Sequence, residues 1–241
     1  MAQALVPLKD LVQAKTRLAG LLTPSERRAL AQAMLEDVLH VLQKHPALQR
    51  VTLVSDDPAA SLIAQRYGAE HLEETTLMSP GLNPVIEAAT DRLCDTVAGP
   101  MIVLHADLPL LDAADISAVI QRYESTGGLV IGCDRHRRGT NLLAFGTDSR
   151  QRFCFGKDSY ALHCRAARDK GVRPHEIFRP GIALDLDEAQ DLLELMRRLP
   201  KAGERTRALL AANDLGKRLS VALTALETGN SDWPGESAAH E

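Results

Sequence analysis

Residues 101–111, with the sequence MIVLHADLPLL, most constrain what this chain can fold into. Met101 to Leu104 form a continuous apolar run, which is typical of a strand buried on both faces of a parallel sheet. The run leads directly to Asp107, and Pro109 ends it. Open α/β sheets bind ligands outside the carboxyl ends of their strands, and a carboxylate there can hold a divalent metal against a phosphate. The motif therefore predicts an α/β fold with Asp107 at its ligand-binding edge.

A second acidic pair lies in the segment IALDLD, residues 182–187. If residues 182–186 form a strand, Asp185 and Asp187 point to one face, because residues two apart in a strand share a face. The two leucines of the segment then point to the other face. Two separated carboxylate sites of this kind indicate metal-assisted phosphate chemistry. Which of Asp185 and Asp187 would contact the metal directly stays open.

Apolar runs alternate with helical patterns along most of the chain, which predicts a mixed, mostly parallel sheet. One helix start is especially clear, because Thr23 can cap it, Pro24 suits its first position and Glu26 can close a capping box. Residues 70–80 are predicted to be a loop. The predicted strands are 3–8, 51–55, 101–105, 129–132, 142–145 and 182–186, and the predicted helices are 24–45, 58–67, 84–97, 113–125, 160–170 and 188–199.

The strand and helix pattern loosens beyond Pro200. We therefore predict one α/β domain over residues 1–200, followed by a helical extension over 201–228. A basic amphipathic helix is expected at 203–227. Residues 229–241 are polar, and we expect them to be disordered.

Composition excludes several classes of partner. Aromatic residues make up 3% of the chain and the formal net charge is −4, which argue against base stacking and against general polyanion binding. The four cysteines show no CxxC pairing, which favours reduced thiols in a cytosolic protein. The N-terminal apolar run is too short for a signal peptide, and no segment could span a bilayer. We expect a cytoplasmic protein without nucleic-acid or membrane partners.

A basic segment follows the first predicted strand. Lys9, Lys15 and Arg17 place three cations just past the strand end, where a triphosphate would need neutralising. A solvated basic helix face has the same spacing, so both interpretations stay open at this point.

Several motifs occur together in a specific order and resemble the 2-phospho-L-lactate guanylyltransferase family, which serves assembly of the deazaflavin coenzyme F-420. The resemblance covers roughly residues 5–199. It implies an α/β, Rossmann-like nucleotidyltransferase fold of the GT-A type, similar to molybdopterin guanylyltransferase. It also implies transfer of GMP from GTP to 2-phospholactate, phosphoenolpyruvate or 3-phosphoglycerate. The motifs are PLKDLVQAKTRLAG, LVSDD, GLN, HADLPLL, DRHRRGTNLLAFG, CFGKDSY and PGIALDLDEAQDL.

The resemblance implies roles for matching positions. Lys9 and Lys15 would contact the GTP phosphates with Arg17 beside them, and Lys15 and Asp107 would be the catalytic residues. Ser55, Gly81 and Asn83 would line the guanosine pocket. Asp107, together with Asp185 or Asp187, would bind Mg²⁺. Thr140, Gly156 and Ser159 would hold the phospho-acid.

Each of these residues has a structural alternative. Ser55 can simply end a strand, Gly81 can permit a positive φ, and Asn83 can start a helix. Asp187 can cap the helix that follows, with Gln190 completing a capping box, and capping can coexist with metal binding.

The acceptor site has independent physical support. Residues 155–159, FGKDS, precede a predicted helix, so unpaired N–H groups and a partial positive charge would form an anion site there. Gly156 would let the backbone approach the ligand, and Thr140 and Asn141 could add hydrogen bonds. Arg137-Arg138 and Lys157-Asp158 depart from the family's common residues, which leaves the identity of the acid open.

Two other functions remain alternatives. A nucleotide-sugar glycosyltransferase of similar fold usually carries Asp-x-Asp at the mid-chain strand end. In this chain Asp107 stands at the first Asp, but Pro109 stands at the second. A non-catalytic nucleotide-sensing domain would be favoured if Lys15 or Asp107 proved dispensable. A homodimer is also left open.

Overall fold

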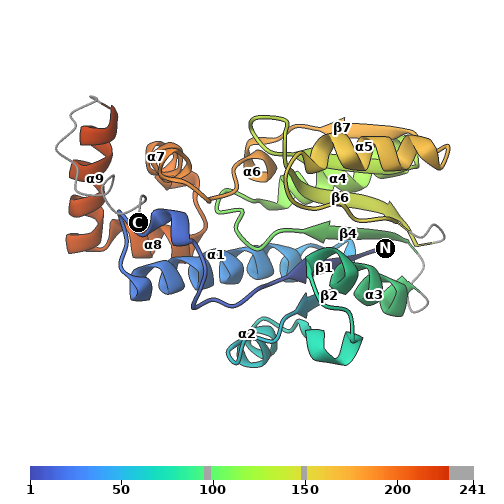
Figure 1. Cartoon of the computed structure of the whole chain (residues 1–241), viewed down its shortest axis with the longest axis horizontal. Coiled ribbons are helices and arrows are strands. Elements are labelled where there is room, and N and C mark those ends of the chain that lie inside the picture. Colours follow the sequence, from blue (N-terminus) through green and yellow to red (C-terminus); the bar gives the residue numbers. More distant parts are fainter. Residues whose placement is uncertain (95–98, 148–150, 228–241) are drawn as a thin grey trace.

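The computed structural model describes residues 1–94, 99–147 and 151–227, and the predicted disorder of residues 229–241 lies outside them. Seven strands form one mixed sheet (Figure 1). Within the described residues β6 alone runs antiparallel to its neighbours, β4 and β5, so the predicted mixed, mostly parallel sheet is confirmed. The strands in sheet order are β3 (Glu70–Leu72), β2 (Leu48–Val54), β1 (Ala2–Pro7), β4 (Pro100–Leu104), β6 (Thr140–Gly146), β5 (Leu129–Cys133) and β7 (Pro174–Ile177).

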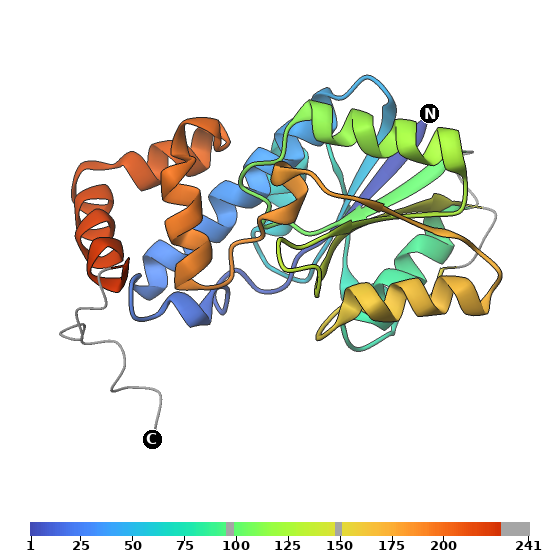
Figure 2. The same cartoon turned by 90° about the horizontal axis from the view of Figure 1, so that it is seen from above.

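Helices cover both faces of the sheet (Figure 2). One face packs against α1 (Pro24–Lys44), α2 (Ala60–Arg66) and α4 (Ala113–Thr126), and the other against α3 (Leu82–Cys94) and α5 (Ser159–Asp169). Because successive strand residues point to opposite faces, Ala4 and Val6 of β1 belong to the first core and Leu5 to the second. This two-sided burial explains the continuous apolar runs of the central strands.

Three C-terminal helices form a helical lobe beside the sheet (Figure 2). They are α7 (Ala189–Arg197), α8 (Glu204–Ala211) and α9 (Asn213–Glu227). Leu30 and Met34 of α1 belong to the apolar core of this lobe. The Asp37 carboxylate of α1 accepts a hydrogen bond from the backbone N–H of Thr206 at 2.9 Å, and a Cβ on Gly203 would lie 2.3 Å from Asp37. The start of α8 therefore sits directly on α1.

The structure corrects four sequence-based expectations. Residues 182–186 are not a strand: Pro180–Ala183 form the short helix α6, and the chain then runs extended without a strand partner. The predicted loop at 70–80 contains β3 and the 3-10 helix η2 (Glu74–Leu77). β7 was not predicted. The single helix expected at 203–227 is two helices, α8 and α9, because Ala212 is extended with ψ of 134°.

Short helices complete the fold: η1 (Thr16–Leu18) lies in the segment after β1, and η3 (Leu199–Lys201) joins α7 to α8. Among the described helices, none combines the length and the apolar character needed to cross a membrane.

Candidate active site

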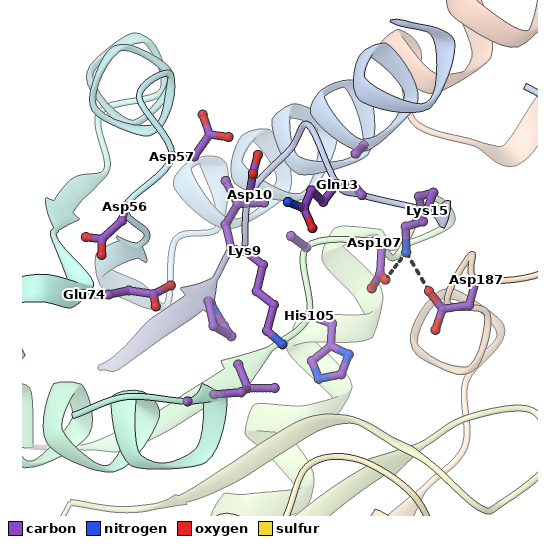
Figure 3. Close-up of a pocket in the computed structure, with 17 residues that line it drawn as sticks. Lys9, Asp10, Gln13, Lys15, Asp56, Asp57, Glu74, His105, Asp107 and Asp187 are labelled. Atoms are coloured by element: carbon purple, nitrogen blue, oxygen red, sulfur yellow. Dashed lines mark hydrogen bonds and ion pairs between the residues drawn. The ribbon is translucent and has the colours of Figure 1, made fainter. Parts of the chain in front are cut away.

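A pocket of about 900 Å³ lies at the carboxyl ends of β1, β2 and β4. These three strands are adjacent and parallel, so the loops that follow them meet at one edge of the sheet. Figure 3 shows the side chains that these loops, η2 and the segment before α7 place around the pocket. The pocket lies where the sequence predicted the ligand-binding edge, with Asp107 in its wall.

Lys15 contacts two of the three predicted metal ligands. Its ammonium donates hydrogen bonds to the Asp107 carboxylate and, at 2.9 Å, to Asp187 Oδ1 (Figure 3). The Lys15 side chain is 8% exposed, so the alternative of a solvated basic face does not hold for this residue. Burial alone would lower the pKa of Lys15, but the charges of Asp107 and Asp187 outweigh it and raise the pKa above its usual value. Lys15 is therefore a buried, permanent cation.

Asp107 has one carboxylate oxygen in use and one idle. Oδ2 accepts from Lys15, whereas Oδ1 is buried and has no hydrogen-bond partner among the described residues. Burial alone would raise the pKa of Asp107, but the charge of Lys15 holds it below its usual range. The Asp107 carbonyl also accepts the backbone N–H of Leu186 at 3.2 Å, which ties the two acidic segments together.

Asp185 and Asp187 have different environments. Burial, and then the charge of Asp107, raise the pKa of Asp185 to about 7, although its carboxylate accepts a hydrogen bond from Asn141 Nδ2 at 3.1 Å. Asp187 is half-exposed and lines the pocket. It is not a helix cap, as the sequence suggested it could be, because α7 begins at Ala189 with Glu188 as its N-cap. The Asp191 carboxylate accepts both the Asp187 and Glu188 backbone N–H groups.

These carboxylates are the candidate metal ligands. Within the described ranges, no group of three or more His, Cys, Asp or Glu side chains is arranged to hold a metal ion as it stands. The ammonium of Lys15 lies between Asp107 and Asp187 instead. The buried Oδ1 of Asp107 nevertheless accepts no hydrogen bond from the described residues, so it is available as a metal ligand. A set of oxygen ligands suits a hard cation such as Mg²⁺. The residue types present therefore fit a magnesium ion.

His105 is a pocket residue that the sequence analysis did not assign to the site. Its ring lies against Phe155, with 5.1 Å between ring centroids, and its buried Nε2 has no hydrogen-bond partner in the described part of the chain. Burial lowers the pKa of His105. Its position directly after β4, on the same edge as Asp107, was the signal that could have identified it.

The predicted nucleotide ligands divide into two groups. Lys9 and Gly81 line the pocket, and Gly81 has a φ of +100°. Ser55, Asn83 and Arg17 do not line it. Ser55 is buried, and its hydroxyl accepts the Asp57 N–H at 3.0 Å. The Asn83 side chain is hydrogen-bonded to the backbone N–H and carbonyl of Phe155, at 2.8 and 3.0 Å. Arg17 pairs at 3.1 Å with Glu188 on the surface.

The predicted acceptor residues lie outside the pocket lining, and the side chains of Thr140, Asn141 and Ser159 all have hydrogen-bond partners. Ser159 Oγ accepts the Thr140 N–H at 2.8 Å, and the Thr140 hydroxyl is 3.0 Å from His163 Nδ1. His163 Nε2 accepts the Cys154 N–H at 2.8 Å, so Nδ1 carries the proton of the neutral ring. Asn141 donates to Asp185 and, at 2.9 Å, to the Ile182 carbonyl.

The loop before α5 has the glycine expected of an anion site, but two of the N–H groups that were expected to be unpaired are bonded. The Ser159 N–H donates to the Gly156 carbonyl at 3.2 Å, and the Tyr160 N–H donates to the Arg138 carbonyl at 3.1 Å. Gly156 is exposed with a φ of +125°, and Asp158 is the N-cap of α5 with a φ of +56°. An added Cβ on Gly156 would meet no atom within 4 Å, so the glycine serves the backbone conformation rather than close packing.

Comparisons with known proteins identify the family. Residues 2–219 match the family described as "Guanylyl transferase CofC like". The phosphoenolpyruvate guanylyltransferase of Rubrobacter xylanophilus is 38% identical over 192 residues, which cover 80% of this chain and 92% of that protein. A structure from Desulfovibrio desulfuricans G20, assigned as a nucleotide-diphospho-sugar transferase, has a TM-score of 0.74 at 17% identity and covers 91% of this chain and 97% of its own.

A cytidylyltransferase from Leptospira borgpetersenii has a TM-score of 0.56 at 12% identity, with 94% of this chain and 95% of that chain covered. At such identities the structural likeness shows the fold, and it confirms the predicted Rossmann-like nucleotidyltransferase architecture. The match over residues 2–219 and the 38% identity show that the chain belongs to the CofC-like guanylyltransferase family.

Proposed function

We propose that the protein transfers GMP from GTP to the phosphate of phosphoenolpyruvate and releases pyrophosphate. The observation that carries the proposal is the pocket wall in which Lys15, Asp107 and Asp187 meet at the carboxyl edge of the sheet. The name of the Rubrobacter relative favours phosphoenolpyruvate as the acceptor. 2-Phospholactate and 3-phosphoglycerate are the competing acceptors, and coenzyme F-420 biosynthesis is the pathway we propose.

The reaction needs little acid–base chemistry. A phosphate oxygen of the acceptor attacks the α-phosphorus of GTP in line, and the bond from that phosphorus to the oxygen bridging the β-phosphorus breaks. Pyrophosphate leaves with the bonding electron pair. Because a phosphate monoester is largely ionised near pH 7, positioning and charge neutralisation supply most of the catalysis. Lys9 and Lys15, which line the pocket, are the cations we propose for the triphosphate.

We propose that Asp107, together with Asp185 or Asp187, holds Mg²⁺. Bound Mg²⁺ neutralises phosphoryl charge and polarises the phosphoryl oxygens. Asp107 would contribute its Oδ1, which has no other partner among the described residues, and a cation there would offset the burial and the charge of Asp107 that raise the pKa of Asp185. Lys15, which pairs with Asp107 and Asp187, would then turn its ammonium to the nucleotide.

The acceptor would bind at the loop before α5. The side chains of Thr140, Asn141 and Ser159 already have protein partners, and the Ser159 N–H donates to the Gly156 carbonyl at 3.2 Å. We therefore propose that the anionic acid is held mainly by the backbone N–H groups of residues 156–158. The contact of Phe155 with His105 places this loop next to the pocket wall.

Pyrophosphate release from GTP tests the proposal, with phosphoenolpyruvate, 2-phospholactate and 3-phosphoglycerate assayed separately in the presence of Mg²⁺. We expect release with phosphoenolpyruvate, and none when the acid or the metal is omitted. Absence of release with all three acids would overturn the proposed reaction. Release that is fastest with another of the acids would replace only the acceptor.

A further inference from the structure

The pocket wall opposite Lys15 is acidic. Asp56 and Asp57 follow β2, and Glu74 is the first residue of η2. Since β2 and β4 flank β1 and neighbouring strands lie about 4.8 Å apart, the ends of β2 and β4 are about 10 Å apart. Figure 3 shows Lys9 between this acidic wall and the Lys15–Asp107 pair. The Lys15 end carries a buried ammonium between two carboxylates, whereas this wall carries the carboxylates of Asp56, Asp57 and Glu74. The two ends therefore suit different parts of a ligand.

Most carboxylates on this wall already have backbone partners. Asp57 uses both oxygens, accepting the Leu11 N–H at 2.8 Å and the Ala59 N–H at 2.8 Å. Asp56 Oδ1 accepts the Thr75 N–H at 3.1 Å. These bonds hold the loops after β1 and β2 in shape and give both residues a structural role.

Glu74 is the exception on this wall. Its side chain extends from η2 toward the side of the pocket where Lys9 lies (Figure 3), and no described residue donates a hydrogen bond to it. Burial, and then the charge of Asp56, raise the pKa of Glu74, whereas the charge of Lys9 opposes that shift. A half-buried carboxylate without a donor is poorly stabilised, so a ligand that offers N–H groups would improve its environment.

The nucleobase is the part of GTP that suits this wall. Acidic side chains repel a triphosphate. Of the two cations proposed for the triphosphate, Lys15 lies at the other end of the pocket and Lys9 lies between the two ends (Figure 3). Guanine carries two adjacent donors, N1–H and the 2-amino group, on one edge, and a carboxylate can accept from both. Adenine and cytosine present a ring nitrogen acceptor beside their amino group, so a carboxylate would face a lone pair.

We propose that Glu74 reads the N1–H and 2-amino groups of guanine and so makes the pocket selective for guanine nucleotides. The inference rests on the proposed function in taking GTP as the nucleotide with its phosphates at the Lys15 end. Glu74 would be a specificity residue that touches the base and takes no part in the bond changes at the α-phosphorus.

Calorimetric titration of the full chain with GTP, ITP and XTP in Mg²⁺, without any acceptor acid, tests the inference. ITP lacks the 2-amino group, and XTP has a carbonyl in its place. We expect the wild-type chain to bind GTP about 10-fold or more tightly than ITP or XTP, because a hydrogen bond to a charged group is at stake. Glu74→Gln should gain affinity for XTP, since its amide can accept from N1–H and donate to the 2-carbonyl.

Glu73→Gln is the matched control, because Glu73 is the exposed neighbour of Glu74, does not line the pocket and bonds Thr76 only through its backbone carbonyl. This variant should keep the wild-type preference. If Glu74→Gln and Glu74→Ala keep the wild-type ratios of GTP to ITP and XTP affinity, Glu74 does not read the base. The titration contains no acceptor acid, so it is independent of the pyrophosphate assay. If pyrophosphate release fails but Glu74→Gln changes the base preference, only the proposed reaction is rejected. If release is observed but the base preference does not change, only the role of Glu74 is rejected.

Discussion

The pocket differs from the acceptor segment, the residues around Thr140 and Ser159 that the sequence assigned to the phospho-acid. The difference lies in the hydrogen bonds of their polar side chains. In the pocket, Asp107 Oδ1 and His105 Nε2 are buried without partners among the described residues. In the acceptor segment, Thr140, Ser159 and His163 satisfy one another and the backbone around them. An unsatisfied buried polar group costs stability, so a ligand in the pocket that bonded these two atoms would be favoured there, whereas the satisfied side chains of the acceptor segment hold its local structure. Substitutions in the two regions should therefore change different measurements.

Asp107→Asn should have the largest effect, because it removes the charge of the carboxylate that has a free oxygen in the pocket. We expect the fold to be kept and the turnover to fall by about 100-fold or more, as for loss of a key electrostatic group. Pyrophosphate release at saturating Mg²⁺ and GTP, with a thermal melt of the same preparation, measures both. Near wild-type turnover would show that the free oxygen has no catalytic use.

His163 should make the acceptor segment sensitive to acid. Burial lowers the pKa of His163 to about 4 from an unfolded value near 6.5, so the unfolded chain binds the proton more readily. The stability that this group contributes is complete above about pH 6.5 and is lost as the pH falls toward 4, by up to about 3 kcal/mol. Urea unfolding between pH 4 and 7 should show a shallower pH dependence for His163→Gln than for wild type.

The exposed His136 gives the control for this experiment, since His136→Gln should leave the pH dependence as it is. Equal slopes for His163→Gln and wild type would mean that the network does not depend on a neutral imidazole.

Lys15→Ala should destabilise the pocket. The sequence left a solvated basic face open as an alternative for this residue, but the side chain is buried between two carboxylates, and its removal leaves them without their cation. We expect a loss of about 2 kcal/mol in EDTA, less than for a fully buried pair because Asp187 is half-exposed. Mg²⁺ should restore more stability to this variant than to wild type. Arg17→Ala, which removes an exposed pair, is the control and should cost less than about 1 kcal/mol.

If Lys15→Ala and Arg17→Ala have equal effects in EDTA, the buried pair contributes no more than a surface pair. If Mg²⁺ stabilises Lys15→Ala no more than wild type, these carboxylates do not gain a metal ion in place of the ammonium.

Ser159→Ala should have the smallest effect of the series. It leaves the buried Thr140 N–H without an acceptor, which should lower the free energy of unfolding by about 1 to 2 kcal/mol and leave GTP affinity unchanged. Chemical denaturation and nucleotide titration measure the two quantities. Ser125→Ala, on the surface of α4, should change stability by less than about 0.5 kcal/mol. A weaker GTP affinity in Ser159→Ala would place the acceptor segment in the nucleotide site and would contradict the proposed difference between the two regions.

The sequence predicted the central strands because their residues are buried on both faces. Met101 to Leu104 form an uninterrupted apolar run, and no other element type fits it as well. The edge strands β3 and β7, EHL and PHEI, are short and polar, so they carry no such run. The alternation in residues 182–187 was misread as a strand: Leu184 and Leu186 are buried as expected, but the segment is extended chain without a sheet partner.

Within the site, the position of a residue after a predicted strand identified pocket residues, but the sequence did not predict which of them contact one another. Asp107 could be placed because it follows a recognisable strand, and Lys9 because it follows another. The pairing of Lys15 with Asp187 could not, since 172 positions separate the two and only the folded topology brings them together. Asn83 was assigned to guanosine from its motif, but its side chain holds the backbone of Phe155. A motif alone does not distinguish a residue that binds a ligand from one that supports the residue that does.

The sharing of α1 between the sheet and the helical lobe has a consequence during synthesis. Leu30 and Met34 emerge from the ribosome early, but their partners in α8 and α9, such as Leu210 and Leu219, are made about 180 residues later. At about 5–20 residues per second, this apolar stretch stays uncovered for roughly 10 to 35 s. The nascent chain therefore exposes an apolar helix face until α8 and α9 have been made, and a chaperone bound to that face would shield it until those helices appear.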